Sequence, residues 1–152
     1  MTGSAFRFRL ERVRKVRERS EDVAKQELAR AIAHRTRGAE DLRTAQEHVE
    51  HAQNQQRMTG AGAVTVNATE LVARQAFLER AEARRAESER ELSQRDSEVA
   101  ERDASLANAA IEHEMLNRLR QRHLGEHTRE LDRKERGSLD EIATQRFGRS
   151  SA

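Results

Sequence analysis

Leucine or valine recurs at intervals of seven along much of the second half of this chain. The row consists of Leu71, Leu78, Arg85, Leu92, Val99, Leu106 and His113. On a helix, such a repeat forms a narrow apolar stripe that is buried only when another helix wraps against it. The pattern therefore predicts a coiled coil, which is typical of rods, shafts and adaptors rather than of enzymes.

The composition agrees with long helices and a thin seam between them. The 152 residues include no proline, the residue that breaks helix interiors. Charged residues make up 37% and aromatic residues 3%, which is too little bulky apolar material for a wide globular core. A disordered chain can be as highly charged, but the sustained repeat and the many helix formers favour order. There is no cysteine, no secretory signal and no long apolar run, so we expect a cytoplasmic protein without disulfides.

Glycines divide the chain into two predicted helices. The first is expected over about residues 6–57 and the second over about 68–146, joined by a short connection over about 58–67. Gly60 and Gly62 suit the end of a helix, and Asn67 or Thr69 can cap the next one. We therefore predict an all-α protein in which residues 1–152 form one domain, a long two-helix antiparallel coiled-coil hairpin. The same repeats also permit a longer dimer.

Two rows of residues in the middle of the first helix have coiled-coil spacing, one with mostly large side chains and one with small ones. The rows are Leu28, Arg35, Leu42 and Val49, and Ala31, Gly38, Ala45 and Ala52. Together they predict a closely packed seam. The expected register places Val49 near Leu78, Leu28 near Val99, and Leu10 near Asn117. Arg35 and Arg85 lie on the large rows, where they either fix the register or extend their charged ends to water.

The apolar pattern changes toward both ends of the chain. Near the start it moves to Phe6, Leu10, Val13, Val16, Ser20 and Val23, which indicates a stutter between Val23 and Leu28. Beyond Leu106 the second helix is apolar over a broader face, with Ile111, Met115, Leu116, Leu119, Leu124, Leu131, Leu139 and Ile142. Much of this stretch is expected to extend past the first helix, and such a face requires a partner.

Short motifs that could carry chemistry are better explained by helix surfaces. His123-Leu-Gly-Glu-His127 fits a zinc peptidase pattern, but a thin rod offers neither a third ligand nor a cleft. His48 and His51, three residues apart, have the spacing for a metal site, but a solvated helix face explains them much better. We therefore predict no catalytic, metal-binding or cofactor-binding residues and no cofactor. The locally basic stretch from Arg7 to Arg19 could bind nucleic acid, yet no aromatic residues are placed for base stacking, and we expect neither nucleic-acid binding nor membrane insertion.

Both ends of the chain resemble those of the flagellar export protein FliJ family. The resemblance rests on Phe6-Arg-Phe-Arg-Leu-Glu-Arg-Val13, Val16-Arg-Glu-Arg19, Ala24-Lys-Gln-Glu-Leu-Ala29 and Lys134-Glu-Arg-Gly-Ser-Leu-Asp-Glu-Ile-Ala143. It implies a non-enzymatic, shaft-like coiled coil of the flagellar type III export apparatus. Such proteins dock into the hexameric export ATPase, promote its assembly and activity, contact the cytoplasmic domain of the export-gate membrane protein, and escort export chaperones. The implied location is the cytoplasmic face of the inner membrane at the flagellar base.

The resemblance also implies which residues meet the partners. The end that faces the ATPase would contain Phe6, Phe8, Arg9, Leu10, Arg12, Val13, Leu139, Asp140, Glu141 and Ile142. The surface that faces the export gate would contain Asp41, Ala45, His48, Ala52, Phe77 and Ala81. Phe77 is either an interface anchor or ordinary packing at the edge of the seam. Where other family members carry aromatic residues on the first helix, this chain has His48 and Ala52.

Two other classes of protein fit the same repeats. A structural stalk or scaffold protein would explain the heptads but not the terminal motifs. A nucleic-acid-binding coiled coil would explain the basic N-terminal stretch, and its binding would weaken steeply with salt.

Overall fold

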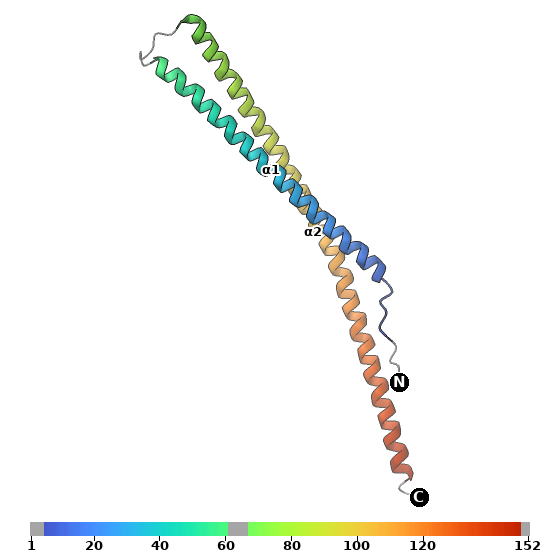
Figure 1. The fold of residues 1–152 in the computed structure, drawn as a ribbon. Coiled ribbons are helices and arrows are strands. Elements are labelled where there is room, and N and C mark those ends of the chain that lie inside the picture. Colours follow the sequence, from blue (N-terminus) through green and yellow to red (C-terminus); the bar gives the residue numbers. More distant parts are fainter. Residues whose placement is uncertain (1–4, 61–66, 150–152) are drawn as a thin grey trace. The chain divides into compact units, whose positions relative to one another are not determined.

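The computed structural model describes residues 5–60 and 67–149, and within them it contains two helices and no strand. Helix α1 runs over Glu11–Gly60 and helix α2 over Ala68–Arg149. Figure 1 shows the two helices, coloured along the sequence from blue near the N-terminus to red near the C-terminus. The all-α, two-helix antiparallel fold predicted from the heptads is confirmed.

Helix α1 begins about one turn later than the sequence suggested, at Glu11 rather than near Phe6. Residues 5–8 have no regular structure, and Arg9 and Leu10 form a turn. The backbone N–H of Glu11 donates to the Phe8 carbonyl at 3.2 Å, and that of Arg14 donates to the Leu10 carbonyl at 2.9 Å. Phe8 is buried, which fixes the chain just before the helix. The acidic Glu11 in the first turn suits the positive end of the helix dipole.

Helix α2 begins where the sequence predicted, because Asn67 caps it. The Asn67 side-chain oxygen accepts a hydrogen bond from the Thr69 backbone N–H at 2.9 Å, and the Asn67 carbonyl accepts from Glu70 at 3.0 Å. Such a cap satisfies N–H groups that have no partner inside the helix. Helix α1 ends at Gly60, three residues beyond the expected end near residue 57. Most of the predicted connection, with Gly62, lies outside the described residues.

Contacts divide the chain into two compact units. The tip unit is Val23–Ala107, and the terminal unit is Met1–Asp22 with Asn108–Ala152. In the tip unit Glu27 pairs with Arg102 and Gln56 bonds Gln75, so residue numbers rise on one helix as they fall on the other. The same inverse order holds in the terminal unit, where Glu11 pairs with Arg120 and Glu21 with His113. Both units are therefore antiparallel helix pairs.

Small residues form the most buried row of the tip unit. On α1 the row consists of Ala24, Ala31, Gly38, Ala45 and Ala52, and on α2 it includes Ala81 and Ser88. The larger Leu28, Leu42, Leu78, Leu92 and Val99 flank it half-buried, and Val49 is buried as well. Small side chains let two helix backbones approach closely, so the thin seam inferred from the alternation is confirmed. Leu71 and Arg85, which belong to the heptad row of α2, are exposed.

Arg95 crosses the seam at the position of Gly38. A side chain on Gly38 would meet the Arg95 guanidinium at 2.4 Å and its Cδ at 2.9 Å, so the glycine provides the space that Arg95 occupies. The Arg95 guanidinium donates to the His34 carbonyl at 3.3 Å and lies 3.6 Å from the Asp41 carboxylate. This fit matches one position on α1 to one position on α2. It therefore helps to set the register, which a repeating apolar pattern alone does not.

The expected register was wrong by about one helical turn. Arg35 pairs with Asp96 and Arg14 bonds Asn117, whereas the expected register opposed Asn117 to Leu10. Each α1 residue therefore meets a partner about one turn further along α2 than predicted. Arg35 is exposed and reaches across to Asp96, while Arg85 pairs with Glu89 on its own helix.

The predicted stutter between Val23 and Leu28 is also absent. The half-buried row of α1 continues at seven-residue spacing from Arg14 through Glu21 to Leu28. The aliphatic residues assigned to the apolar row, Leu10, Val13, Val16 and Val23, are exposed, and Val16 keeps 59% of its surface in water. On its α1 side, the seam of the terminal unit thus has the polar Arg14 and Glu21 at positions that are apolar in an ordinary coiled coil.

Candidate functional site

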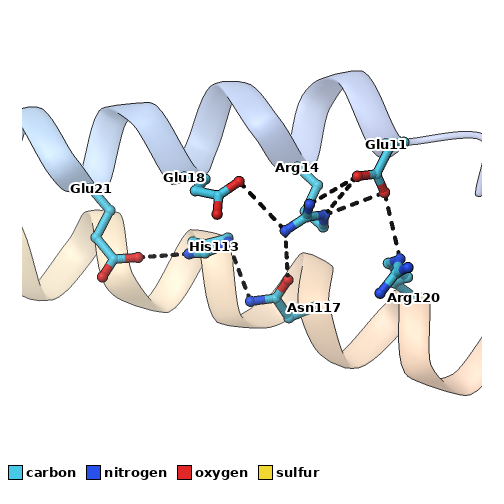
Figure 2. Close-up of polar contacts among 7 residues, drawn as sticks. All are labelled: Glu11, Arg14, Glu18, Glu21, His113, Asn117 and Arg120. Carbon is cyan, nitrogen blue, oxygen red and sulfur yellow. Dashed lines mark hydrogen bonds and ion pairs between the residues drawn. The ribbon is translucent and has the colours of Figure 1, made fainter.

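A chain of hydrogen bonds fills the seam of the terminal unit (Figure 2). The Arg14 guanidinium donates to the Asn117 side-chain oxygen at 3.4 Å, and the Asn117 amide nitrogen lies 3.2 Å from His113 Nε2. His113 Nδ1 lies 2.7 Å from the Glu21 carboxylate, and both side chains are only 16% exposed. A carboxylate only accepts, so His113 donates from Nδ1 and accepts the Asn117 amide at Nε2. Four polar side chains from two helices thereby satisfy one another.

Glu11 closes the network at the start of α1. Its carboxylate accepts from the Arg14 guanidinium at 2.8 Å and lies 3.5 Å from Arg120 on α2 (Figure 2). The hydrogen bond from Arg14, together with the nearby positive charges, lowers the pKa of Glu11 below its ordinary value of 4.5. The same hydrogen bond raises the pKa of Arg14. Glu11 therefore remains ionised and joins the first turn of α1 to α2.

The lowered pKa of Glu11 predicts a stability that depends on acid pH. A carboxyl with a lower pKa in the folded state stabilises that state above its unfolded pKa, and this contribution is lost as the pH falls through the folded pKa. We expect the urea midpoint to fall as the pH is lowered below about 4.5, with a smaller fall in Glu11→Gln. Arg14→Met removes the hydrogen bond that contributes most to the lowered pKa of Glu11, so it should reduce the pH dependence in the same way. Parallel pH profiles for both variants and the wild type would contradict this assignment.

Two phenylalanines hold the N-terminal segment against α2. The ring of Phe8 lies 5.8 Å from that of His123 in an edge arrangement, and the ring of Phe6 lies 5.7 Å from that of His127. Aromatic pairs at this separation attract one another beyond the area that they bury. The two histidines of the peptidase-like motif thus pack against Phe8 and Phe6. No group of three or more His, Cys, Asp or Glu that could hold a metal ion occurs among residues 5–60 and 67–149.

A basic groove opens beside these rings. It has a volume of about 820 Å³ and is lined by Phe6, Arg7, Phe8, Arg9, Glu11, Arg12 and Arg120. We call it the basic groove. Its lining has four arginines and one acidic residue, so it carries an excess of positive charge.

The predicted ATPase-facing residues fall into two groups that the structure does not bring together. Leu10 and Val13 are partly exposed near the basic groove, whose lining includes Phe6, Phe8, Arg9 and Arg12. Leu139, Asp140, Glu141 and Ile142 are exposed on α2. Leu139 lies twelve positions beyond His127, the ring partner of Phe6, which corresponds to about 18 Å along the helix. The two groups thus belong to the same unit but form separate surfaces.

The predicted gate-facing residues are divided between the seam and the surface. Ala45, Ala52 and Ala81 are buried in the seam of the tip unit, so their side chains cannot contact a partner while the helices are paired. Asp41 and His48 are exposed, and Asp41 lies close to Arg95 across the seam.

Phe77, the aromatic member of that predicted surface, is 39% exposed. It lines a groove of about 570 Å³ with His51, Asn54, Gln55, Met58, Glu70, Ala73 and Arg74. Exposed Asp41, His48 and Phe77 therefore remain available as partner-facing residues of the tip unit.

Sequence reasoning missed the polar network because it assigned apolar residues to the seam. The repeat places His113 on the heptad row and Asn117 opposite Leu10, but it indicates no polar partner for either residue. A usable signal exists, since Arg14 and Glu21 continue the seven-residue row of Leu28 and Leu42 without a break. Extending that row rather than following the valines would have placed Arg14 and Glu21 in the seam.

The described residues form helical pairs that are joined by ion pairs, hydrogen bonds and aromatic contacts. None of their helices is both long and apolar enough to cross a membrane. The fold and the polar seam define an all-helical antiparallel coiled-coil protein with a basic groove close to the start of α1.

The family described as flagellar FliJ protein matches residues 6–152, which is nearly the entire chain. The chain belongs to this family and is accordingly a component of flagellar export. No curated protein and no solved structure matches it.

Proposed function

We propose that this protein acts as a non-enzymatic shaft of the export apparatus, and that its terminal unit docks into the ring of the flagellar export ATPase. The basic groove carries the proposal, because it combines arginines that have no acidic partner among the described residues with the half-buried ring of Phe6, and Leu10 follows its lining residue Arg9 in the sequence. Phe6 is half-buried and Leu10 is 38% exposed, so both retain surface that a partner can cover. An end of this kind suits insertion into another protein better than contact with water.

Docking would promote assembly of the ATPase and bias the conformations of its subunits. Three further features are proposed from the family: contact with the cytoplasmic domain of the export gate, escort of export chaperones, and a peripheral location at the flagellar base. Asp41, His48 and Phe77 support a gate contact on the tip unit, since they are exposed while the alanines between them form the seam. A structural stalk that lacks an ATPase partner is the alternative.

Deletion of residues 1–20 tests the docking end. It removes Phe6, Phe8 and Arg14, and with them the ring contacts and one end of the polar network, whereas every contact within the tip unit stays. We expect the truncated protein to remain helical by circular dichroism and to lose stimulation of the organism's own export ATPase. The measurements are the ATP hydrolysis rate and the size of the complex with and without the protein.

A matched control replaces the aromatic residue of the other unit. Phe77→Ala removes one partly exposed ring from the tip unit and leaves the basic groove intact, so stimulation should be unchanged. Normal stimulation by the truncated protein would refute the docking end. If the intact, helical protein neither binds nor stimulates the ATPase, the structural stalk becomes the better account.

A further inference from the structure

Three arginines of the basic groove have no acidic partner in the part of the chain that the structure describes. Arg7, Arg9 and Arg12 are exposed and make no ion pair with a described residue. Four other arginines of the terminal unit are paired. Arg14, Arg17, Arg118 and Arg120 each lie within 4.0 Å of a glutamate. Arg19 and Arg122 also make no ion pair with a described residue, but neither lines the groove, so it is the groove that brings three arginines without a described acidic partner together.

The groove already shows how it holds a carboxylate. Glu11 lines it and lies between two guanidinium groups, with its oxygens 2.8 Å from Arg14 and 3.5 Å from Arg120. Arginine offers several N–H donors in a flat fork that matches a carboxylate, and such charged hydrogen bonds are among the strongest in proteins. Arg7, Arg9 and Arg12 present the same chemistry on the open side. They can donate hydrogen bonds to further carboxylates without displacing Glu11.

Apolar surface beside the charge indicates a polypeptide rather than a free anion. Phe6 is half-buried on His127, and Leu10 and Val13 are 38% and 44% exposed within the first turns that border the groove. A small anion would leave this apolar surface in water, whereas a protein segment can cover it and place acidic side chains on the arginines.

We infer that the basic groove binds an acidic segment of a partner protein, a helix or loop that combines carboxylates with at least one apolar side chain. The identification of that partner as the export ATPase rests on the proposed function. The recognition chemistry does not, because Arg7, Arg9 and Arg12 define it on this chain alone.

Binding of a synthetic peptide to the full-length protein tests the inference. The probe is a fluorescein-labelled helical peptide of Glu, Ala and Leu, and its binding is measured by fluorescence anisotropy. A control peptide carries Gln in place of every Glu. We expect the acidic peptide to bind, the control peptide to bind at least about tenfold more weakly, and the affinity to fall as salt is added.

Matched charge reversals locate the site. Arg12→Glu and Arg19→Glu make the same charge change at exposed positions of α1, but only Arg12 lines the groove. Arg12→Glu should weaken binding by about tenfold or more, whereas Arg19→Glu should change it by less than about threefold. Arg9→Glu, outside the helix, should reproduce the loss without any effect on helix formation. Circular dichroism checks that all three variants fold.

Several results would overturn the inference. Equal losses in Arg12→Glu and Arg19→Glu would mean that only overall charge matters, and equal affinity for the two peptides would assign the groove to apolar contacts. Binding to vesicles that contain phosphatidylserine, sensitive to Arg12→Glu and without peptide binding, would assign it to a membrane surface. If the protein binds the peptide but does not stimulate the ATPase, the groove assignment stands and the proposed function is rejected. If the protein stimulates the ATPase but does not bind the peptide, only the groove assignment is rejected.

Discussion

Replacing Ala52 with leucine is expected to lower the free energy of unfolding by about 2 kcal/mol, within the range found for overpacked cores. Ala52 is 2% exposed and belongs to the row of small residues that lets the two helices of the tip unit approach closely. Three additional carbon atoms have no space there, so the helices must separate or the side chain must leave its preferred rotamer. The measurement is the urea midpoint followed by circular dichroism at 222 nm.

Ala39→Leu provides the matched control, since Ala39 is exposed on the same helix. Leucine there should change the free energy of unfolding by less than about 0.5 kcal/mol. Ser88→Ala should have the opposite sign to Ala52→Leu. Ser88 is 2% exposed and its hydroxyl has no hydrogen-bond partner, so its removal should raise the free energy of unfolding by about 1 kcal/mol. Equal effects of Ala52→Leu and Ala39→Leu would mean that the helices are not closely packed at Ala52.

Much of this fold could be predicted because a heptad pattern specifies which face of each helix is buried. The alternation of large and small residues identified Ala31, Ala45 and Ala52 as seam residues, and Asn67 marked the start of α2. The axial register could not be predicted in the same way. A repeating stripe permits several alignments, and contacts such as that of Arg95 with Gly38 belong to only one of them.

The candidate site was less predictable because polar residues take seam positions in the terminal unit. A pattern search follows Val13 and Val16, yet both are exposed, while Arg14 and Glu21 face the partner helix. Polar side chains are acceptable there only because their partners on α2 satisfy them, and pairings between distant residues are not visible in a single sequence. The terminal motifs correctly indicated the family, but not that Phe6 and Phe8 would lie on His127 and His123.

The second large effect is expected at the Glu21–His113 pair, which replaces an apolar layer in the seam. Either single substitution, Glu21→Leu or His113→Leu, leaves one mostly buried polar group without its 2.7 Å partner. We expect each to lower the free energy of unfolding by about 1–3 kcal/mol. The double variant removes both polar groups and places two leucines at facing positions. The Asn117 amide loses its acceptor on His113, so we expect the double variant to be about as stable as the wild type and clearly more stable than the sum of the two single losses would give.

A double-mutant cycle measured by urea unfolding separates this pair from ordinary surface charges. Arg17 and Glu112 form the control pair, because they lie 2.7 Å apart across the same unit but are 45% and 50% exposed. Alanine substitutions there should give a coupling energy below about 1 kcal/mol, whereas the Glu21–His113 cycle should exceed it. Amide hydrogen exchange over residues 11–22 should be slower in the double leucine variant than in either single variant, because the facing leucines bury each other. If the double variant instead loses the sum of the two single losses, leucines do not pack at these positions, and the polar network rather than the helix geometry specifies how the terminal unit pairs.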